Sequence, residues 1–147
     1  MIAVLTRSHS LSSLAIRARL GEPWSHALVP ASPVRCIDAT FKAGGVRSRP
    51  MVDAMAHASA RMYLHLPLDR EREAQDWLES QVGKGYDWRA IWGFAGGSRE
   101  WNDDFAWFCF ELVAGAVELG SAYRFPNRNR VTGKDLIEAS RVLRGES

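Results

Sequence analysis

One segment, residues 109–119, has the clearest pattern in the sequence and constrains the fold most. Its apolar side chains recur at the three- and four-residue spacing of one helix face: Cys109, Leu112, Val113, Ala116 and Val117. Gly120 follows as a natural stop. A helix of this kind must bury its apolar face against another layer of structure. We therefore expect a helix over residues 109–119 that packs on the rest of the core.

Three more helices are expected from capping residues and apolar spacing. Ser10 precedes the first helix, and Gly21 follows its end. The apolar side chains of this helix share one face: Leu11, Leu14, Ala15 and Ala18. Asp69 precedes the second helix, which Gly83 stops, and Thr132 precedes the third. A short helix is also expected between residues 88 and 94.

Strands are expected where short apolar runs or alternating apolar and polar residues occur. These segments are residues 2–5, 24–30, 34–40 and 61–66. Residues 42–50 contain two glycines and three basic residues and are expected to form a loop, as are residues 96–104. Strands combined with helices in this way predict an α+β fold with a mainly antiparallel sheet. A chain of 147 residues has room for a single domain, over residues 1–147.

The composition excludes several classes of protein. Hydrophobic residues make up 46% and charged residues 24%, which argues against disorder and coiled coil. The net charge of +2 and the basic turn over residues 124–130 do not indicate a nucleic-acid partner. Two cysteines and four histidines show no metal-binding spacing, so no metal and no cofactor is expected. The apolar run over residues 1–5 is too short for a signal peptide or a membrane span, so we expect a cytoplasmic protein.

Two of the expected strands, residues 24–30 and 34–40, form a hairpin if residues 31–33 make the turn. In that register His26 lies directly opposite Asp38 on one face, with Cβ atoms about 5 Å apart. A slip of one residue would turn Asp38 to the other face. A neighbouring carboxylate fixes the orientation of an imidazole and favours its charged form. The pair is therefore either the base and its orienting residue in a nucleophilic triad or a pair that only stabilises the sheet.

Each of the two cysteines needs its own explanation. Cys109 lies where a helix begins, and free backbone N–H groups at such a place lower the pKa of a thiol and can hold an oxyanion. Cys109 also falls on the apolar stripe, so an inert core cysteine is the other interpretation. Cys36 lies in mid-strand on the expected face of Asp38 and is expected to pack near the site. A bridge between the cysteines would require the strand face to meet the helix start, and a cytoplasmic setting argues against it.

Three segments carry a resemblance to a known family. They are WSHALV at residues 24–29, QVGKGYDW at residues 81–88 and WFCFELV at residues 107–113. Together they resemble the NlpC-like papain-fold cysteine peptidases, in the circularly permuted branch that includes YiiX/YebB-like amidases and lecithin retinol acyltransferase. Histidine before cysteine is the order of that branch. Asp38 falls on the next strand, where the family has its third polar residue.

The resemblance implies a permuted papain-like fold with the nucleophile at a helix N-terminus. It makes Cys109 the nucleophile, His26 the base and Asp38 the residue that orients the base. It also places Tyr86 beside the oxyanion on the substrate side. No cofactor and no metal is implied.

Two positions depart from the family pattern. Phe110 stands where members usually have serine after the cysteine, and Gly85 stands where proline usually precedes the tyrosine. A phenylalanine at position 110 would reshape the hydrogen-bond donors behind Cys109 or narrow the substrate cleft.

The activity implied by the resemblance is hydrolysis of amide bonds, in peptidoglycan stems or other peptides, through an acyl-thioenzyme. Two alternatives stay open. The first is a lipid acyltransferase or thioesterase of the same fold, and the second is a catalytically silent module that binds peptide or lipid. The expected partners are therefore a peptide, a peptidoglycan fragment or a lipid, with no nucleic acid and no membrane span. The oligomeric state has no signal in the sequence.

Overall fold

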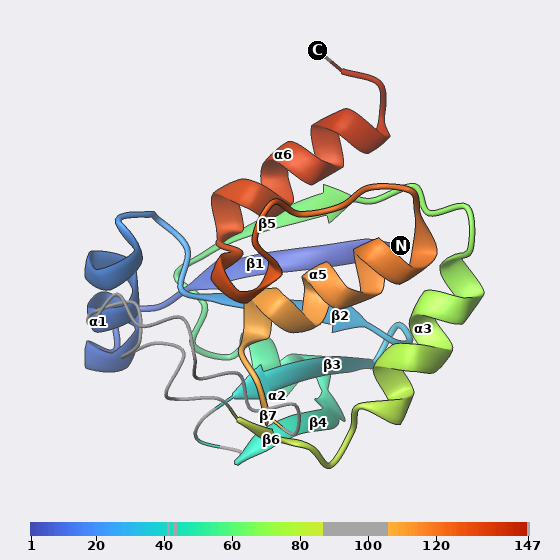
Figure 1. The fold of residues 1–147 in the computed structure, drawn as a ribbon. Helices are drawn as coiled ribbons and strands as arrows, with labels where there is room; N and C mark the ends of the chain where they lie inside the picture. Colours follow the sequence, from blue (N-terminus) through green and yellow to red (C-terminus); the bar gives the residue numbers. More distant parts are fainter. Residues whose placement is uncertain (41, 43, 87–105, 147) are drawn as a thin grey trace.

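A five-stranded sheet forms the centre of the computed structural model, which describes residues 1–40, 42, 44–86 and 106–146 (Figure 1). The strand order is β4-β3-β2-β1-β5, and every neighbouring pair is antiparallel. The strands are β1 (Ile2–Arg7), β2 (His26–Pro30), β3 (Arg35–Thr40), β4 (Gly45–Pro50) and β5 (Ala60–His65). The α+β fold with a mainly antiparallel sheet is confirmed. The helix expected over residues 88–94 and the loop expected over 96–104 lie outside the described residues.

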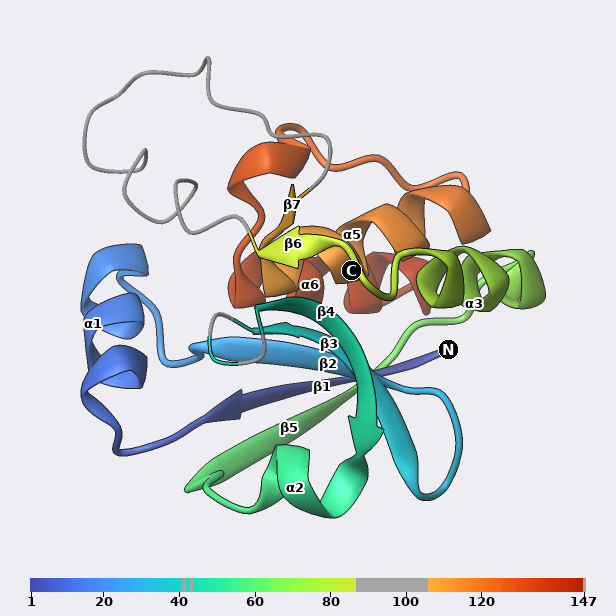
Figure 2. The same ribbon diagram turned by 90° about the horizontal axis from the view of Figure 1, so that it is seen from below.

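Helices cover both faces of the sheet unequally (Figure 2). One face carries α3 (Glu71–Ser80), α5 (Cys109–Gly120) and α6 (Gly133–Leu143), and the opposite face carries only α2 (Met51–Met55) among the described helices. Helix α1 (Leu11–Leu20) lies at one end of the sheet. A short parallel pair, β6 (Gly85–Tyr86) with β7 (Ala106–Trp107), leads into α5, and a 3₁₀ turn, η1 (Arg128–Arg130), precedes α6. The larger core lies under α5, and a smaller one lies under α2.

Helix α5 begins at Cys109, as the sequence predicts. The carboxylate of Glu111 accepts a hydrogen bond from the backbone N–H of Phe108 at 3.3 Å, which fixes the first turn. All five residues of the expected apolar stripe are buried. Gly115 lets the helix approach α3 closely, since a Cβ at this position would lie 2.5 Å from the Trp77 ring. The position of Cys109 is therefore set by a capped helix packed in the core.

Helix α1 has the expected cap but not the expected face. The hydroxyl of Ser10 accepts from the backbone N–H of Ser13 at 3.2 Å. Leu11 and Leu14, expected in the core, are 85% and 46% exposed. A hydrogen bond of 2.7 Å between the hydroxyls of Ser13 and Ser25 ties the opposite side of the helix to the sheet. The inward side is made by Ser13, Ile16 and Leu20.

The prediction of a loop over residues 42–50 is wrong for residues 45–50, which form strand β4. Val46 is fully buried, and its backbone N–H donates to the carbonyl of Lys84 at 2.9 Å. Gly45 has a φ of 139° and lies so close to the Lys84 carbonyl that a side chain would collide with it. The basic residues that suggested a loop are tolerated because β4 is an edge strand of the sheet.

The hairpin of β2 and β3 forms, but its register differs from the expected one by two residues. Leu28, not His26, lies opposite Asp38. The turn is longer than three residues, because the N–H groups of Ala31 and Ser32 both donate to the carbonyl of Arg35, at 3.0 and 3.1 Å. A shift of two residues preserves the face of every side chain. His26 and Asp38 therefore stay on one face as diagonal neighbours rather than direct ones.

Of the two other predicted helix caps, the one at Asp69 is wrong and the one at Thr132 is confirmed. Asp69 does not cap α3, whose first flanking residue is Arg70 with no side-chain cap. Thr132 does precede α6, where the carboxylate of Asp135 accepts from both its N–H and its hydroxyl at 2.8 Å. In the described part of the chain, no helix has the length and apolar character needed to cross a membrane.

Candidate active site

His26 and Asp38 are joined across two strands. The ring Nε2 of His26 lies 2.9 Å from Oδ2 of Asp38, a distance that only the diagonal placement and the length of both side chains allow. The Asp38 side chain is completely buried, whereas that of His26, the first residue of β2, is 19% exposed. Because Nε2 contacts Asp38, Nδ1 is the ring nitrogen that remains for another partner.

Cys109 is the second group that acts on the His26 ring. It is the first residue of α5 and is 1% exposed, and α5 packs across β2 and β3. Burial works against charge on the His26 ring, but hydrogen bonds with Asp38 and Cys109, and the negative charges of both, raise the pKa of His26 to about 9. The structure thus brings together three residues that the sequence predicts for the site. An imidazole that retains its proton at neutral pH lies between a carboxylate and a thiol.

Arg49 is a fourth member of the cluster, and sequence reasoning missed it. Its Nε donates to Oδ1 and Oδ2 of Asp38 at 3.0 and 3.1 Å, and its Nη2 also donates to Oδ2. Residue 49 falls in the segment expected to be a loop, because glycines and basic residues dominate that stretch. The signal that could have found it is the alternation of Val46 and Ser48 with Arg47 and Arg49, which is typical of a strand.

Asp38 receives one partner from each neighbouring strand. His26 reaches it from β2 and Arg49 from β4, each two residues away from the directly opposed position. Burial raises the pKa of a carboxyl group, but the hydrogen bonds and positive charges of His26 and Arg49 outweigh that effect and lower the pKa of Asp38. Asp38 is therefore a carboxylate whose negative charge is shared between an imidazole and a guanidinium.

Cys36 is buried on the same face as Asp38 but is not part of the hydrogen-bonded cluster. Its side chain is fully buried and packs with Val4 and Leu28 under α2. Burial and the charge of Asp38 raise the pKa of the Cys36 thiol to about 11. Cys36 and Cys109, both within the described residues, are free and form no disulfide. Cys36 is a packing residue beside the site.

The Phe110 side chain is not positioned to block access to His26. It is fully buried in the main core and packs edge-to-face on Phe108, with ring centroids 5.4 Å apart at 77°. Tyr86 lies in β6, where its backbone is paired with that of Trp107, two residues before Cys109. The structure describes Tyr86 by its backbone alone, so the substrate-side role of its side chain stays a prediction.

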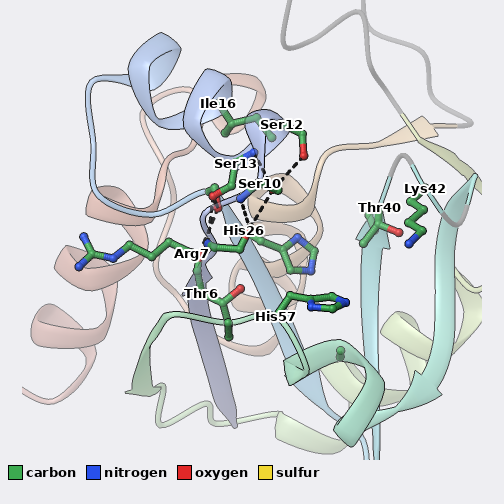
Figure 3. Close-up of a pocket in the computed structure, with 15 residues that line it drawn as sticks. Thr6, Arg7, Ser10, Ser12, Ser13, Ile16, His26, Thr40, Lys42 and His57 are labelled. Carbon is green, nitrogen blue, oxygen red and sulfur yellow. Dashed lines mark hydrogen bonds between the residues drawn. The ribbon is translucent and has the colours of Figure 1, made fainter.

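A cavity of about 260 Å³ opens beside His26 (Figure 3). It lies between the end of β1, the first turns of α1 and the end of α2, and the described residues that line it include seven with a hydroxyl group and four basic ones. Phe110 is not among the residues that line it. The exposed side of His26 therefore faces a polar space large enough for a small ligand.

Comparison with solved structures relates this architecture to a known protein. The crystal structure of metalloprotein yiiX from Escherichia coli O157:H7 (DUF1105) matches with a TM-score of 0.59 and 22% sequence identity. The match covers 84% of this chain and 66% of the yiiX chain. The chain has the yiiX fold. At this identity the likeness concerns the fold, which is α+β and papain-like as the sequence predicts. No family model matches the sequence, and no curated protein matches it either.

The description of yiiX as a metalloprotein raises the question of a metal site in this chain. Within residues 1–40, 42, 44–86 and 106–146, no group of three or more His, Cys, Asp or Glu side chains is placed to hold a metal ion. The carboxylate of Asp38 next to His26 already binds the Arg49 guanidinium. The described residues around His26 therefore do not fit a metal centre.

Proposed function

We propose that this protein is a cysteine hydrolase that cleaves amide bonds through an acyl-thioenzyme. Cys109 is the nucleophile, His26 the general base, and Asp38 the residue that positions His26. One observation carries the proposal: the His26 ring binds Asp38 through Nε2 and interacts with the Cys109 thiol as well. This is the arrangement of nucleophile, base and orienting group that nucleophilic catalysis requires.

The steps follow from these positions. In the reactive pair the proton of the Cys109 thiol is already held by the His26 ring, and the Cys109 thiolate attacks the carbonyl carbon of the amide. The backbone N–H of Cys109, at the N-terminus of α5, stabilises the oxyanion that forms. The imidazolium then protonates the departing amine, which leaves an acyl group on the sulfur. A water molecule, deprotonated by His26, releases the acid and restores the thiol.

Arg49 supports both protonation states of His26 in this scheme. When His26 transfers its proton, the buried Asp38 would lose its counter-ion if Arg49 were absent. An unpaired buried carboxylate is costly, so the protonated ring would then be held too strongly. With the guanidinium within hydrogen-bond distance of both carboxylate oxygens, Asp38 keeps a counter-ion throughout the reaction. Arg49 is a positioning residue that acts through Asp38.

The cavity beside His26 supports a compact polar substrate over a long lipid chain. Its volume of about 260 Å³ is below the range of about 300–1,000 Å³ that is typical of drug-sized ligands. A long acyl chain needs an extended groove, whereas this cavity is compact. We therefore propose peptides, including the stem peptides of peptidoglycan, as the substrate class. Lipid acyl transfer is the alternative that the substrate panel below tests.

A second candidate function is a binding module without turnover. It is favoured by the burial of Cys109, which is 1% exposed and lies within the main core. In such a module the cavity beside His26 binds a peptide, and the thiol never reaches a carbonyl carbon.

Turnover of a substrate panel separates these functions. Muropeptides, simple peptides and phospholipids are incubated with the parent protein and with Cys109→Ala, and intact-protein mass is recorded during turnover. The proposal expects peptide cleavage by the parent only, with a transient acyl adduct on Cys109. Cleavage that survives in Cys109→Ala, or preferential acyl transfer from phospholipid, would contradict it. Peptide binding without cleavage would establish the binding module. Cys36→Ala is the matched control, because Cys36 is equally buried but outside the cluster.

A further inference from the structure

The cavity beside His26 has a distinctive chemical character. Among the fifteen described residues that line it, seven carry a hydroxyl group, four including His26 are basic, and none is acidic. A wall of this kind suits a ligand rich in negatively charged oxygen atoms. The carboxylate that contacts His26 is that of Asp38, which is fully buried and bound by Arg49. The described part of the wall therefore offers hydrogen-bond donors without a competing acidic side chain.

Thr6 supplies the most specific observation. It lies at the end of β1 and is 5% exposed, yet its hydroxyl has no hydrogen-bond partner in the part of the chain that the structure describes. Figure 3 shows this hydroxyl directed toward the space between His26 and His57. The Thr6 side chain is largely buried, but its hydroxyl oxygen is accessible from the cavity, so a ligand there can accept its proton. Thr6 thus points to a ligand rather than to a packing role.

The serine hydroxyls of the wall are held in place by one another. The hydroxyls of Ser10 and Ser12 lie 3.1 Å apart, and those of Ser13 and Ser25 lie 2.7 Å apart. Because Ser10 caps α1, these groups surround the positive end of a ten-residue helix. The first turn of α1 therefore adds oriented donors to the same side of the cavity as His26.

The basic side chains of the wall differ in whether their charged groups face the cavity. The ring of His57, just beyond α2, lies below the His26 ring in Figure 3, and the Lys42 side chain extends from the neighbouring strand end. The Arg7 guanidinium points away, so Arg7 lines the cavity only with its stem. Figure 3 shows Thr6 and His57 beside the His26 ring, and neither belongs to the proposed catalytic cluster, so both are suited to a test.

We propose that this cavity binds a carboxylate group of the substrate next to the scissile amide bond. The inference rests on the proposed function, since it names the substrate class of the same site: peptides with a free carboxylate close to the bond that is cleaved. The hydroxyl of Thr6 and the ring N–H of His57 donate to the carboxylate oxygens. The α1 N-terminus supports its negative charge.

Binding is measured without turnover, by NMR titration of the full chain with N-acetylglycine and with N-acetylglycinamide, which lacks the charge. The expected result is saturable shifts of the His26 and His57 ring signals, with at least ten-fold tighter binding of the carboxylate. Thr6→Val weakens it three-fold or more, while Thr6→Ser, which keeps the hydroxyl, does not. His57→Gln also weakens binding, whereas His65→Gln, at an exposed histidine outside the cavity, has no effect.

Equal binding of the two probes, or an affinity unchanged in both Thr6→Val and His57→Gln, overturns the inference. Inorganic phosphate is the third probe, and binding more than ten-fold tighter than that of the carboxylate would also overturn it. Failure of the proposed function has a separate signature. Cys109 would then show the alkylation behaviour of an ordinary thiol whether or not the cavity binds carboxylates.

Discussion

The two cysteines of this chain are equally buried but lie in opposite surroundings. Cys36 lies in the middle of a strand, on the α2 side of the sheet, among Val4 and Leu28. Cys109 lies at the start of a helix and interacts with the imidazole of His26. Exposure does not distinguish them, at 0% and 1%. The identity of the neighbouring groups, rather than access, therefore distinguishes the two thiols.

Asp38 links these two regions and acts on each in a different way. Its charge raises the pKa of the Cys36 thiol, which keeps that thiol neutral. The same charge raises the pKa of His26, whose ring interacts with the Cys109 thiol. One carboxylate thus disfavours ionisation of the Cys36 thiol and favours the protonated form of the imidazole beside Cys109.

The largest expected effect comes from removing each thiol in turn. Cys109→Ala should lower hydrolysis about 1,000-fold or more, because the acyl group loses its attachment point. Cys36→Ala should leave turnover within about three-fold and cost about 1 kcal/mol of stability for the lost volume. Turnover and chemical unfolding of both variants check this. Similar activity losses in the two variants would remove the distinction between the cysteines.

Asp38→Asn should reduce turnover by about 100-fold or more, because the ring of His26 loses its orientation and its counter-charge. The change should also move the alkaline limit of the pH–rate profile toward lower pH. Without the negative charge of Asp38, the protonated ring of His26 is less stable, so its pKa falls. Asp53→Asn, on exposed α2, is the matched control and should be neutral. An unchanged pH profile in Asp38→Asn would show that Asp38 only stabilises the sheet.

The stability of the parent protein should fall as pH rises between about 6.5 and 9. The pKa of His26 is raised from 6.5 to about 9 on folding, so its contribution is complete below 6.5 and is lost as pH rises through 9. The shift corresponds to at most roughly 3 kcal/mol. Urea unfolding at several pH values measures it, and Asp38→Asn should flatten the curve. An equally steep curve in that variant would contradict the assignment.

Arg49→Met should destabilise the protein by about 2 kcal/mol, because it leaves the buried Asp38 with a single partner. Arg47→Met lies on the same strand and loses only a hydrogen bond to the Val46 carbonyl, so it should change stability by about 0.5 kcal/mol or less. Thermal or chemical unfolding of the pair provides the comparison. Equal effects would show that the guanidinium contributes nothing through Asp38.

The parts that the sequence predicts are those fixed by local pattern. The start of α5 at Cys109 follows from apolar spacing, and the strands that carry His26 and Asp38 follow from short apolar runs and turn residues. The prediction that His26 and Asp38 lie on one face of the sheet is also confirmed, because the register differs from the expected one by an even number of residues. Three residues of the cluster are thus predictable from the sequence alone.

The parts that the sequence does not predict depend on contacts between distant segments. The hairpin register depends on hydrogen bonds to the Arg35 carbonyl, which extend the turn beyond its expected length. Strand β4 has the sequence of a basic loop, and its place in the sheet depends on distant contacts: the Val46 N–H donates to the Lys84 carbonyl, and Arg49 binds the buried Asp38. The inward face of α1 is set by the bond between Ser13 and Ser25, not by its leucines.

Alkylation of single-cysteine proteins tests the central claim most directly. Iodoacetamide labelling is measured from pH 5 to 10 in Cys36→Ala, which retains only Cys109, and in Cys109→Ala, which retains only Cys36. We predict that Cys109 reacts well below about pH 8.5, the pKa range of a free thiol, and that adding His26→Ala abolishes this reaction. Cys36 should stay unreacted over the same range. Reaction of Cys109 only above about pH 8.5, unchanged by His26→Ala, would contradict the account.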